Sequence, residues 1–186
     1  MFNIAVIVGS LRKESFNKKI IYALDKLNHP NLKFQILDLN EIPIFNQDNE
    51  NNIPAAVINL KNKISNANGI LFVTPEYNRS IPAVLKNIID WGTRPYGKNS
   101  WANKPTAIIG TSPGAIGTAV AQAHLRSILV AIDAIVMGQP EVYLIYKNEL
   151  IDEHHNIINE GTKKFLQGFL DVFNNWVEYH NQNRQL

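Results

Sequence analysis

The sequence predicts a doubly wound α/β fold, in which helices cover both faces of one parallel sheet. Two short runs, 4–8 and 69–73, are apolar without interruption, as in strands that are buried on both faces. Segments with apolar residues at helical spacing alternate with the predicted strands along the chain. Polar loops join the ends of strands to the starts of helices. This alternation is typical of parallel sheets whose crossover connections are helices.

These patterns define the elements in order, and we expect one domain over residues 1–186. The predicted strands are 4–8, 33–38, 69–73, 105–110 and a fifth within 135–144 that Gly138 and Pro140 interrupt. The predicted helices are 17–27, 53–66, 82–92, 118–132 and 157–180, and long loops occupy 39–52 and 93–104. We expect five strands in the flavodoxin-like order 2-1-3-4-5, in which ligands bind at the carboxyl ends of the central strands.

Composition excludes several classes of protein. The chain has no cysteine, which rules out disulfides, thiolate catalysis and cysteine metal sites and favours the cytoplasm. No apolar run approaches the roughly 18 residues that span a membrane. The net charge of +2 comes without a dense run of lysine and arginine, so nucleic acid is not an expected partner. We therefore expect a globular protein that binds small molecules.

The first strand leads into a loop with the composition of an anion site. Residues 9–17 read Gly-Ser-Leu-Arg-Lys-Glu-Ser-Phe-Asn, which combines hydroxyls, an amide and two cations with the start of a helix. Gly9 is the only glycine before Gly69, so the glycine-rich dinucleotide and P-loop motifs are absent. Serine and asparagine groups suit a single terminal phosphate. The alternative is an ordinary capped helix start with solvated charges.

The third strand leads into a loop that carries four chemically different side chains in a row. Residues 76–79 are Glu-Tyr-Asn-Arg, a carboxylate, a flat aromatic, an amide and a guanidinium. Such a set can hold a planar, hydrogen-bonding heterocycle such as a flavin ring. We expect Ser80 to cap the following helix, with Pro82 in its first turn. The alternative is a surface turn in which Tyr77 is a half-buried aromatic.

The fourth strand leads into a loop of small residues, Gly-Thr-Ser-Pro-Gly-Ala-Ile-Gly-Thr at 110–118. Small residues let backbone N–H groups approach a ligand closely, and such donors stabilise negative charge on a ring edge. The alternative is a flexible loop before a helix. Because all three loops leave neighbouring strands of the predicted sheet, we expect them to meet at one edge.

Other candidate sites are weaker. His154 and His155 are adjacent in the sequence, and adjacent side chains point in different directions, so a polar loop is favoured over a metal site. His124 is predicted to lie on a helix surface or at an interface. The GxSxG elbow of serine hydrolases is absent. We therefore predict no metal ligand.

Together the three loops resemble the NADPH-dependent FMN reductase family, a flavodoxin-like group that includes quinone, azo-dye and chromate reductases. The resemblance rests on residues 9–17, on Pro-Glu-Tyr-Asn-x-Ser-x-Pro-x-x-Leu-Lys-Asn-x-Ile-Asp-Trp at 75–91, and on Ser-Pro-Gly-Ala-Ile-Gly with the later His124-Leu125-Arg126. It implies that FMN is held by Ser10, Arg12, Ser15, Phe16 and Asn17 on the phosphate side, by Pro75, Glu76, Tyr77, Asn78 and Arg79 around the ring, and by Ser112 and Gly114 at the pyrimidine edge. Arg12 and Arg79 are further expected to anchor the phosphates of the pyridine nucleotide.

The resemblance also implies the reaction and the assembly. NADPH or NADH would pass hydride to FMN in ping-pong fashion, and a quinone, azo or nitro compound, metal oxyanion or flavin would accept it. Because FMN would carry the hydride transfer, no side chain is expected to act as a catalytic acid or base. Members form homodimers, with Trp91 and His124 as interface candidates, and a tetramer stays open because this chain departs from the family at Thr118, Val120 and Ala123. The alternatives are a flavodoxin-type electron carrier that does not oxidise NADPH, or a flavin-binding regulatory subunit.

Overall fold

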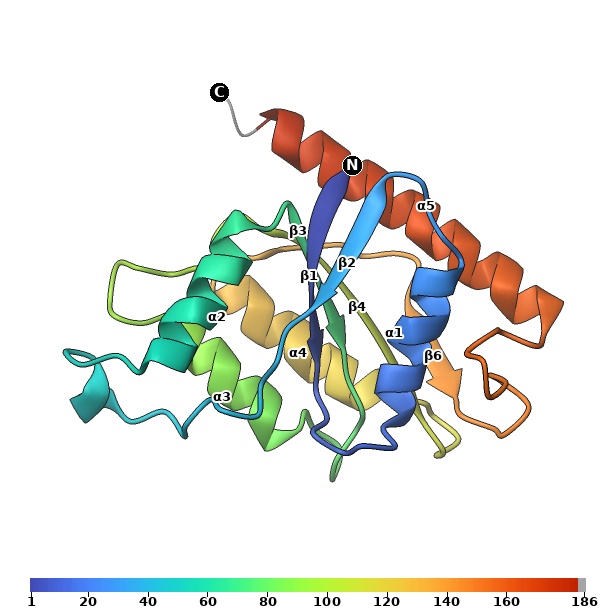
Figure 1. Cartoon of the computed structure of the whole chain (residues 1–186), viewed down its shortest axis with the longest axis horizontal. Helices are drawn as coiled ribbons and strands as arrows, with labels where there is room; N and C mark the ends of the chain where they lie inside the picture. The colour runs from blue at the N-terminus through green and yellow to red at the C-terminus, as the bar shows by residue number, and fades with distance from the viewer. Residues whose placement is uncertain (184–186) are drawn as a thin grey trace.

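The computed structural model describes residues 1–183 and shows one sheet with helices on both faces (Figure 1). The strands are β1 (Phe2–Val8), β2 (Leu32–Ile36), β3 (Gly69–Val73), β4 (Pro105–Ser112), β5 (Ile135–Val136) and β6 (Val142–Ile145). The helices are α1 (Phe16–Lys26), α2 (Ala55–Asn66), α3 (Ala83–Gly92), α4 (Ala119–Ala131) and α5 (Glu160–Gln182), with a short 3-10 helix, η1 (Gln47–Asn49), after β2. Every predicted helix and strand is present with somewhat different boundaries, except that the fifth strand is divided into β5 and β6.

The strands are parallel and follow the order β2-β1-β3-β4-β5, which confirms the predicted order. The fifth position is shared by two short strands, β5 and β6, that both pair with β4. The register against β4 shifts by three residues between them. The residues between β5 and β6 include Gly138 and a cis peptide bond between Gln139 and Pro140. The predicted interruption splits the strand because proline has no N–H to donate to a ladder.

Apolar residues form two cores, one on each face of the sheet. α1 and α5 pack on one face, and α2, α3 and α4 pack on the other (Figure 1). In α5, Leu166, Phe169, Phe173 and Val177 recur at helical spacing, and all are buried. Burial of each such side chain contributes about 1.5–3 kcal/mol. These two cores hold the loops that leave β1, β3 and β4 at one edge of the sheet.

Two expectations about α3 are wrong. Ser80 does not cap the helix, which begins after Pro82 and has no side-chain cap. Instead, the backbones of Ser80 and Tyr77 exchange two hydrogen bonds of 2.9 and 3.0 Å, which close a tight turn before the helix. Trp91 is fully buried within the chain, where its Nε1 donates to the Pro43 carbonyl at 2.8 Å. It is therefore a core residue and cannot contact a partner subunit.

The last helix begins later than predicted, at Glu160. Ile157 pairs with Ile151 in an isolated bridge, so its backbone is not helical. Asn159 then caps the helix, with its Oδ1 accepting the Thr162 N–H at 2.8 Å. The apolar spacing extends to 157, but the cap decides where the helix starts.

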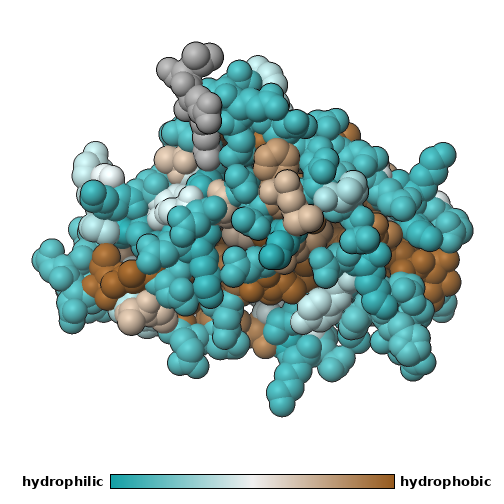
Figure 2. Space-filling model, turned by 45° about the horizontal axis from the view of Figure 1, so that its top comes forward, coloured by the Kyte–Doolittle hydropathy of each residue, from teal (hydrophilic) through white to brown (hydrophobic). Residues whose placement is uncertain are grey.

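The surface is mostly polar on the face shown in Figure 2, where apolar side chains appear in patches between teal ones. Two of the most exposed large apolar side chains, Ile44 and Tyr96, lie in the long loops after β2 and α3. Over residues 1–183, no helix has both the length and the hydrophobicity that crossing a membrane requires.

Candidate functional site

The loops after β1, β3 and β4 meet at the carboxyl edge of the sheet and enclose a cavity of about 240 Å³. The predicted site residues in its lining are Ser10, Arg12, Ser15, Phe16, Asn17, Pro75, Glu76, Tyr77 and Ser112. Thr111 and Pro113 complete the lining. Three predicted residues stand outside it, namely Asn78, Arg79 and Gly114. Residues that are about 100 positions apart in the chain therefore share one site because parallel strands end at the same edge.

The first loop presents hydroxyl groups and a helix start to the cavity. Ser15 is the N-cap of α1, and its Oγ accepts the Lys18 N–H at 3.3 Å. Ser10 is also buried, and its Oγ accepts the Arg12 N–H at 3.4 Å. Both hydroxyls retain a proton to donate. With the positive end of the helix dipole beside them, they form an arrangement suited to an anion.

Asn17 ties the first loop to the third. Its side chain is buried, its Nδ2 donates to the Thr111 carbonyl at 2.9 Å, and its Oδ1 accepts the Thr111 N–H at 3.1 Å. The amide therefore replaces a backbone pairing between two segments that are 94 residues apart. Its oxygen and one amide proton are engaged by the protein, so its side chain holds the walls of the cavity together.

Glu76 ties the second loop to α4. Its Oε2 accepts the N–H groups of Val120 and Ala121, both at 3.1 Å, and the side chain is only 8% exposed. α4 has no cap from its own Thr118, so this carboxylate serves as the cap from another loop. Its other oxygen, Oε1, is 3.4 Å from Arg79 Nη1 on the outer side. A predicted ring-binding residue is thus also a structural clamp.

The second loop is a tight two-residue turn. Asn78 and Arg79 both have positive φ, of 50° and 63°. Positive φ at both central residues is the geometry of a type I′ turn, which joins two strands through a two-residue loop. The turn directs Asn78 and Arg79 outward and leaves Tyr77 half-exposed at the mouth of the cavity.

The third loop is held by close backbone contacts. Ser112 Oγ donates to the Gly117 carbonyl, and the Gly117 N–H donates to the Gly114 carbonyl at 3.0 Å. At Gly110 a Cβ atom would lie 2.2 Å from the Thr74 carbonyl oxygen, so only glycine lets the second and third loops lie this close. The loop is therefore held by hydrogen bonds within itself and by close packing against the second loop.

Sequence reasoning missed one aromatic residue next to the site. Tyr146 follows β6, and its ring stacks on Phe16 with centroids 3.9 Å apart and an angle of 18° between the planes. The Arg12 guanidinium lies 5.7 Å from the centre of the same Phe16 ring. The Tyr146 N–H donates to the Ser112 carbonyl at 2.8 Å. Its position just past the carboxyl end of a parallel strand was the signal that could have identified it.

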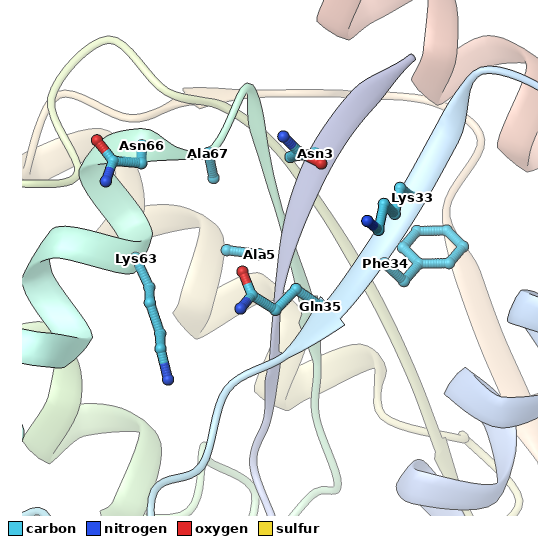
Figure 3. Close-up of a pocket in the computed structure, with 8 residues that line it drawn as sticks. All are labelled: Asn3, Ala5, Lys33, Phe34, Gln35, Lys63, Asn66 and Ala67. Carbon is cyan, nitrogen blue, oxygen red and sulfur yellow. The ribbon is translucent and has the colours of Figure 1, made fainter.

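A larger hollow lies away from the three loops. A hollow of about 450 Å³ opens between α2 and β2, where Lys63 on the helix lies across from Lys33 and Gln35 on the strand (Figure 3). It shares no lining residue with the cavity described above.

The histidines do not form a site of their own. His154 and His155 lie in a turn that Asp152 organises, since its Oδ1 accepts the N–H groups of His154 and Asn156 at 2.9 and 2.7 Å. His124 is exposed on α4, with its Nδ1 3.3 Å from Ser80 Oγ. In the described part of the chain, no cluster of histidine and acidic side chains has the arrangement to hold a metal ion.

Comparison with known proteins identifies relatives along nearly the whole chain. The family model for NADPH-dependent FMN reductases matches residues 2–149. A 2-hydroxy-1,4-benzoquinone reductase from a Burkholderia species is 48% identical over 174 residues, which cover 94% of this chain and 95% of that protein. A quinone reductase from Pseudomonas putida is 42% identical over 179 residues, which cover 96% of each protein.

Solved structures agree with these sequence matches. FerB, a flavoenzyme NAD(P)H:(acceptor) oxidoreductase from Paracoccus denitrificans, superposes with a TM-score of 0.93 at 46% identity over 97% of this chain and 99% of that chain. A flavodoxin from Pseudomonas aeruginosa, at 14% identity and a TM-score of 0.58, shares the fold alone.

Proposed function

The chain belongs to the NADPH-dependent FMN reductase family, and we propose that it reduces quinones with electrons that it takes from NAD(P)H. Membership confirms the predicted family, the oxidoreductase class, FMN as cofactor and a pyridine nucleotide as co-substrate. The choice of a quinone as acceptor is supported by the names of the relatives from Burkholderia and Pseudomonas putida. The observation that carries the proposal is the convergence of three predicted cofactor loops on one cavity.

The residues of the cavity fit FMN. Ser10 and Ser15 supply hydroxyl donors beside the start of α1, and Arg12 supplies a positive charge, which is the donor set that a phosphate monoester requires. Pro75 and the half-exposed Tyr77 offer flat surfaces for a ring system. The cavity volume of about 240 Å³ is smaller than the roughly 300–1,000 Å³ of sites that engulf a ligand. A ring held here would therefore keep one side open.

The protein contributes positioning and charge rather than proton transfer. The FMN that these residues would hold would supply the hydride transfer between the pyridine nucleotide and the acceptor. Asn17 and Glu76 hold the three loops in fixed relation, so that little reorganisation accompanies binding. Ser112 and the backbone around Gly114 would lie at the edge of the ring where negative charge develops. An open side also lets donor and acceptor use the same place in turn, which supports a ping-pong order.

We further propose a single-domain, cytoplasmic homodimer. The exposed groups around the start and outer side of α4 supply the candidate interface, including Ile116, His124 and Val130, of which Val130 is 66% exposed. The absence of cysteine supports the cytoplasm. All strands of the described part belong to one sheet, which supports one domain.

Anaerobic flavin reduction tests the proposed function. The purified protein is reconstituted with FMN, and its visible absorption is recorded before and after NADPH, and again after a stoichiometric addition of 2-hydroxy-1,4-benzoquinone. We expect the flavin band to bleach with NADPH and to return with the quinone.

The outcomes separate the alternatives. A flavin band that persists with both NADPH and NADH would indicate an electron carrier or a regulatory subunit. A band that bleaches but does not return with the quinone would support the reductase activity and contradict the choice of a quinone as acceptor.

Ser15→Ala tests the proposed phosphate site. It removes a hydroxyl from the side proposed for the phosphate, and its FMN affinity should fall.

A further inference from the structure

A second hollow adjoins the cofactor cavity on the β2 side of the first loop. Its volume is about 190 Å³, and it shares Ser10 with the cofactor cavity. The loop at 10–15 is therefore the wall between the two spaces. A molecule that reaches past this wall would occupy both.

The hollow is lined by three large apolar side chains that are partly exposed to solvent. Leu11 is 48% exposed, Tyr22 is 42% exposed and Ile36 is 39% exposed. The Tyr22 ring also contacts the His155 ring, with centroids 5.0 Å apart, which restrains its position. A flat, largely apolar group would cover these surfaces and gain from removing them from water.

A carboxylate and a cation border the same hollow. Asp38 Oδ1 accepts two hydrogen bonds from Asn40, at 3.0 Å from the backbone N–H and 2.7 Å from Nδ2. Its Oδ2 has no hydrogen-bond partner within residues 1–183. These bonds to Asn40, with Lys18 and Lys63 adding smaller effects, hold the pKa of the Asp38 carboxyl below its usual value. Lys18 reaches the hollow from α1 and makes no ion pair with a described residue.

We infer that this hollow binds the adenosine half of the pyridine dinucleotide, an inference that rests on the proposed function. The nicotinamide half would lie against the open side of the flavin ring, at the mouth of the cofactor cavity, and the chain of the dinucleotide would cross the loop near Arg12. Tyr22 and Ile36 would contact the adenine, Asp38 Oδ2 would accept a ribose hydroxyl, and Lys18 would face a phosphate. The larger hollow of Figure 3 is a poorer candidate because it shares no residue with the cofactor cavity.

A truncated substrate tests this inference. NADH and NADPH contain adenosine, whereas reduced nicotinamide mononucleotide does not. Rates of anaerobic flavin reduction are measured with all three donors for the FMN-loaded wild type and for Tyr22→Ala. We expect kcat/KM to fall about 10-fold for both dinucleotides, the size of a lost base–aromatic contact, and to stay at the wild-type value for the mononucleotide. Tyr96→Ala is the matched control, because Tyr96 is 93% exposed in a loop away from the hollow.

The outcomes distinguish this inference from the proposed function. Flavin bleaching by the wild type supports the function whatever the variant does. An equal fall for all three donors, or no fall for any, would overturn the adenosine site. Calorimetric titration of the FMN-loaded protein with ADP-ribose gives a second readout, in which Tyr22→Ala should bind about 10-fold more weakly than Tyr96→Ala.

Asp38→Asn tests the ribose contact. The carboxylate accepts a hydrogen bond from a 2′-hydroxyl but repels a 2′-phosphate. We expect the variant to raise the ratio of kcat/KM for NADPH over NADH by several-fold. An unchanged ratio would show that Asp38 does not face the ribose.

Discussion

The cofactor cavity and the hollow between α2 and β2 are both lined by polar side chains. Within residues 1–183, only the cavity has lining side chains that form hydrogen bonds to other segments of the chain. In the cavity, Asn17 bonds both backbone groups of Thr111, and Glu76 bonds two backbone N–H groups of α4. In the hollow of Figure 3, the side chains of Lys33, Gln35 and Lys63 form no hydrogen bond with residues 1–183. A polar lining alone therefore does not define a site, whereas polar side chains that hold several segments together do.

The largest effect should come from Asn17→Ala. The change leaves the Thr111 N–H and carbonyl without partners in a buried place, which costs about 3 kcal/mol in the free energy of unfolding. Urea unfolding of the flavin-free protein measures it. Gln35→Ala in the α2–β2 hollow is the control and should change stability by less than about 0.5 kcal/mol. If both variants lost the same free energy of unfolding, the proposed difference between the cavity and the hollow would be wrong.

Glu76→Ala should have the next largest effect. It removes the cap from Val120 and Ala121, and we expect a loss of about 1–2 kcal/mol. Glu76→Gln retains an oxygen acceptor and should lose only about 0.3–1 kcal/mol. Thermal unfolding of the flavin-free protein compares the two. If Glu76→Ala unfolds at the wild-type temperature, the carboxylate is not a clamp.

Tyr146→Ala should weaken FMN binding by up to about 10-fold, because a stacked aromatic pair contributes about 0.5–1.5 kcal/mol. Loss of the Tyr146 ring would leave Phe16 without its stacking partner beside Arg12, on the side of the cavity proposed for the phosphate. Quenching of flavin fluorescence gives the dissociation constant. Tyr146→Phe keeps the ring and should bind FMN like the wild type. A weakened Tyr146→Phe would instead assign the effect to the hydroxyl.

The last prediction concerns pH and contrasts two lysines of α2, Lys61 and Lys63. Lys61 Nζ donates to the carbonyls of Gly92 and Lys98, at 2.9 and 2.7 Å, and burial lowers its pKa from 10.5 to about 8. Between pH 8 and 10.5 the unfolded state binds more protons than the folded state, so this group makes stability rise with pH across that window.

Urea unfolding at several pH values between 7.5 and 10 checks this, with Lys61→Gln expected to show a smaller rise than the wild type. Lys63→Gln removes a charge from the same helix without disturbing the two carbonyl contacts, and should keep the wild-type slope. Parallel curves for Lys61→Gln and the wild type would contradict the assignment.

Much of the fold followed from local patterns. Uninterrupted apolar runs at 4–8 and 69–73 predicted buried parallel strands, because burial on both faces of a strand requires apolar residues at every position. Apolar residues at helical spacing predicted the helices, because each helix buries one face. The family and the cofactor followed from three loop motifs. Errors arose where two local signals compete: Ser80 is a good capping residue by type, but its backbone is engaged by Tyr77 in the turn.

From the sequence by itself came the predictions of the strand order, the class of reaction and the three loops proposed to bear the site, since residue types and their spacing are visible in one dimension. Only the tertiary structure decided that Asn17 and Glu76 brace the site, that Tyr146 stacks beside it, and that Trp91 is core. The physical reason is that these roles depend on contacts between segments far apart in the chain. No local propensity records which distant backbone group a buried side chain will meet.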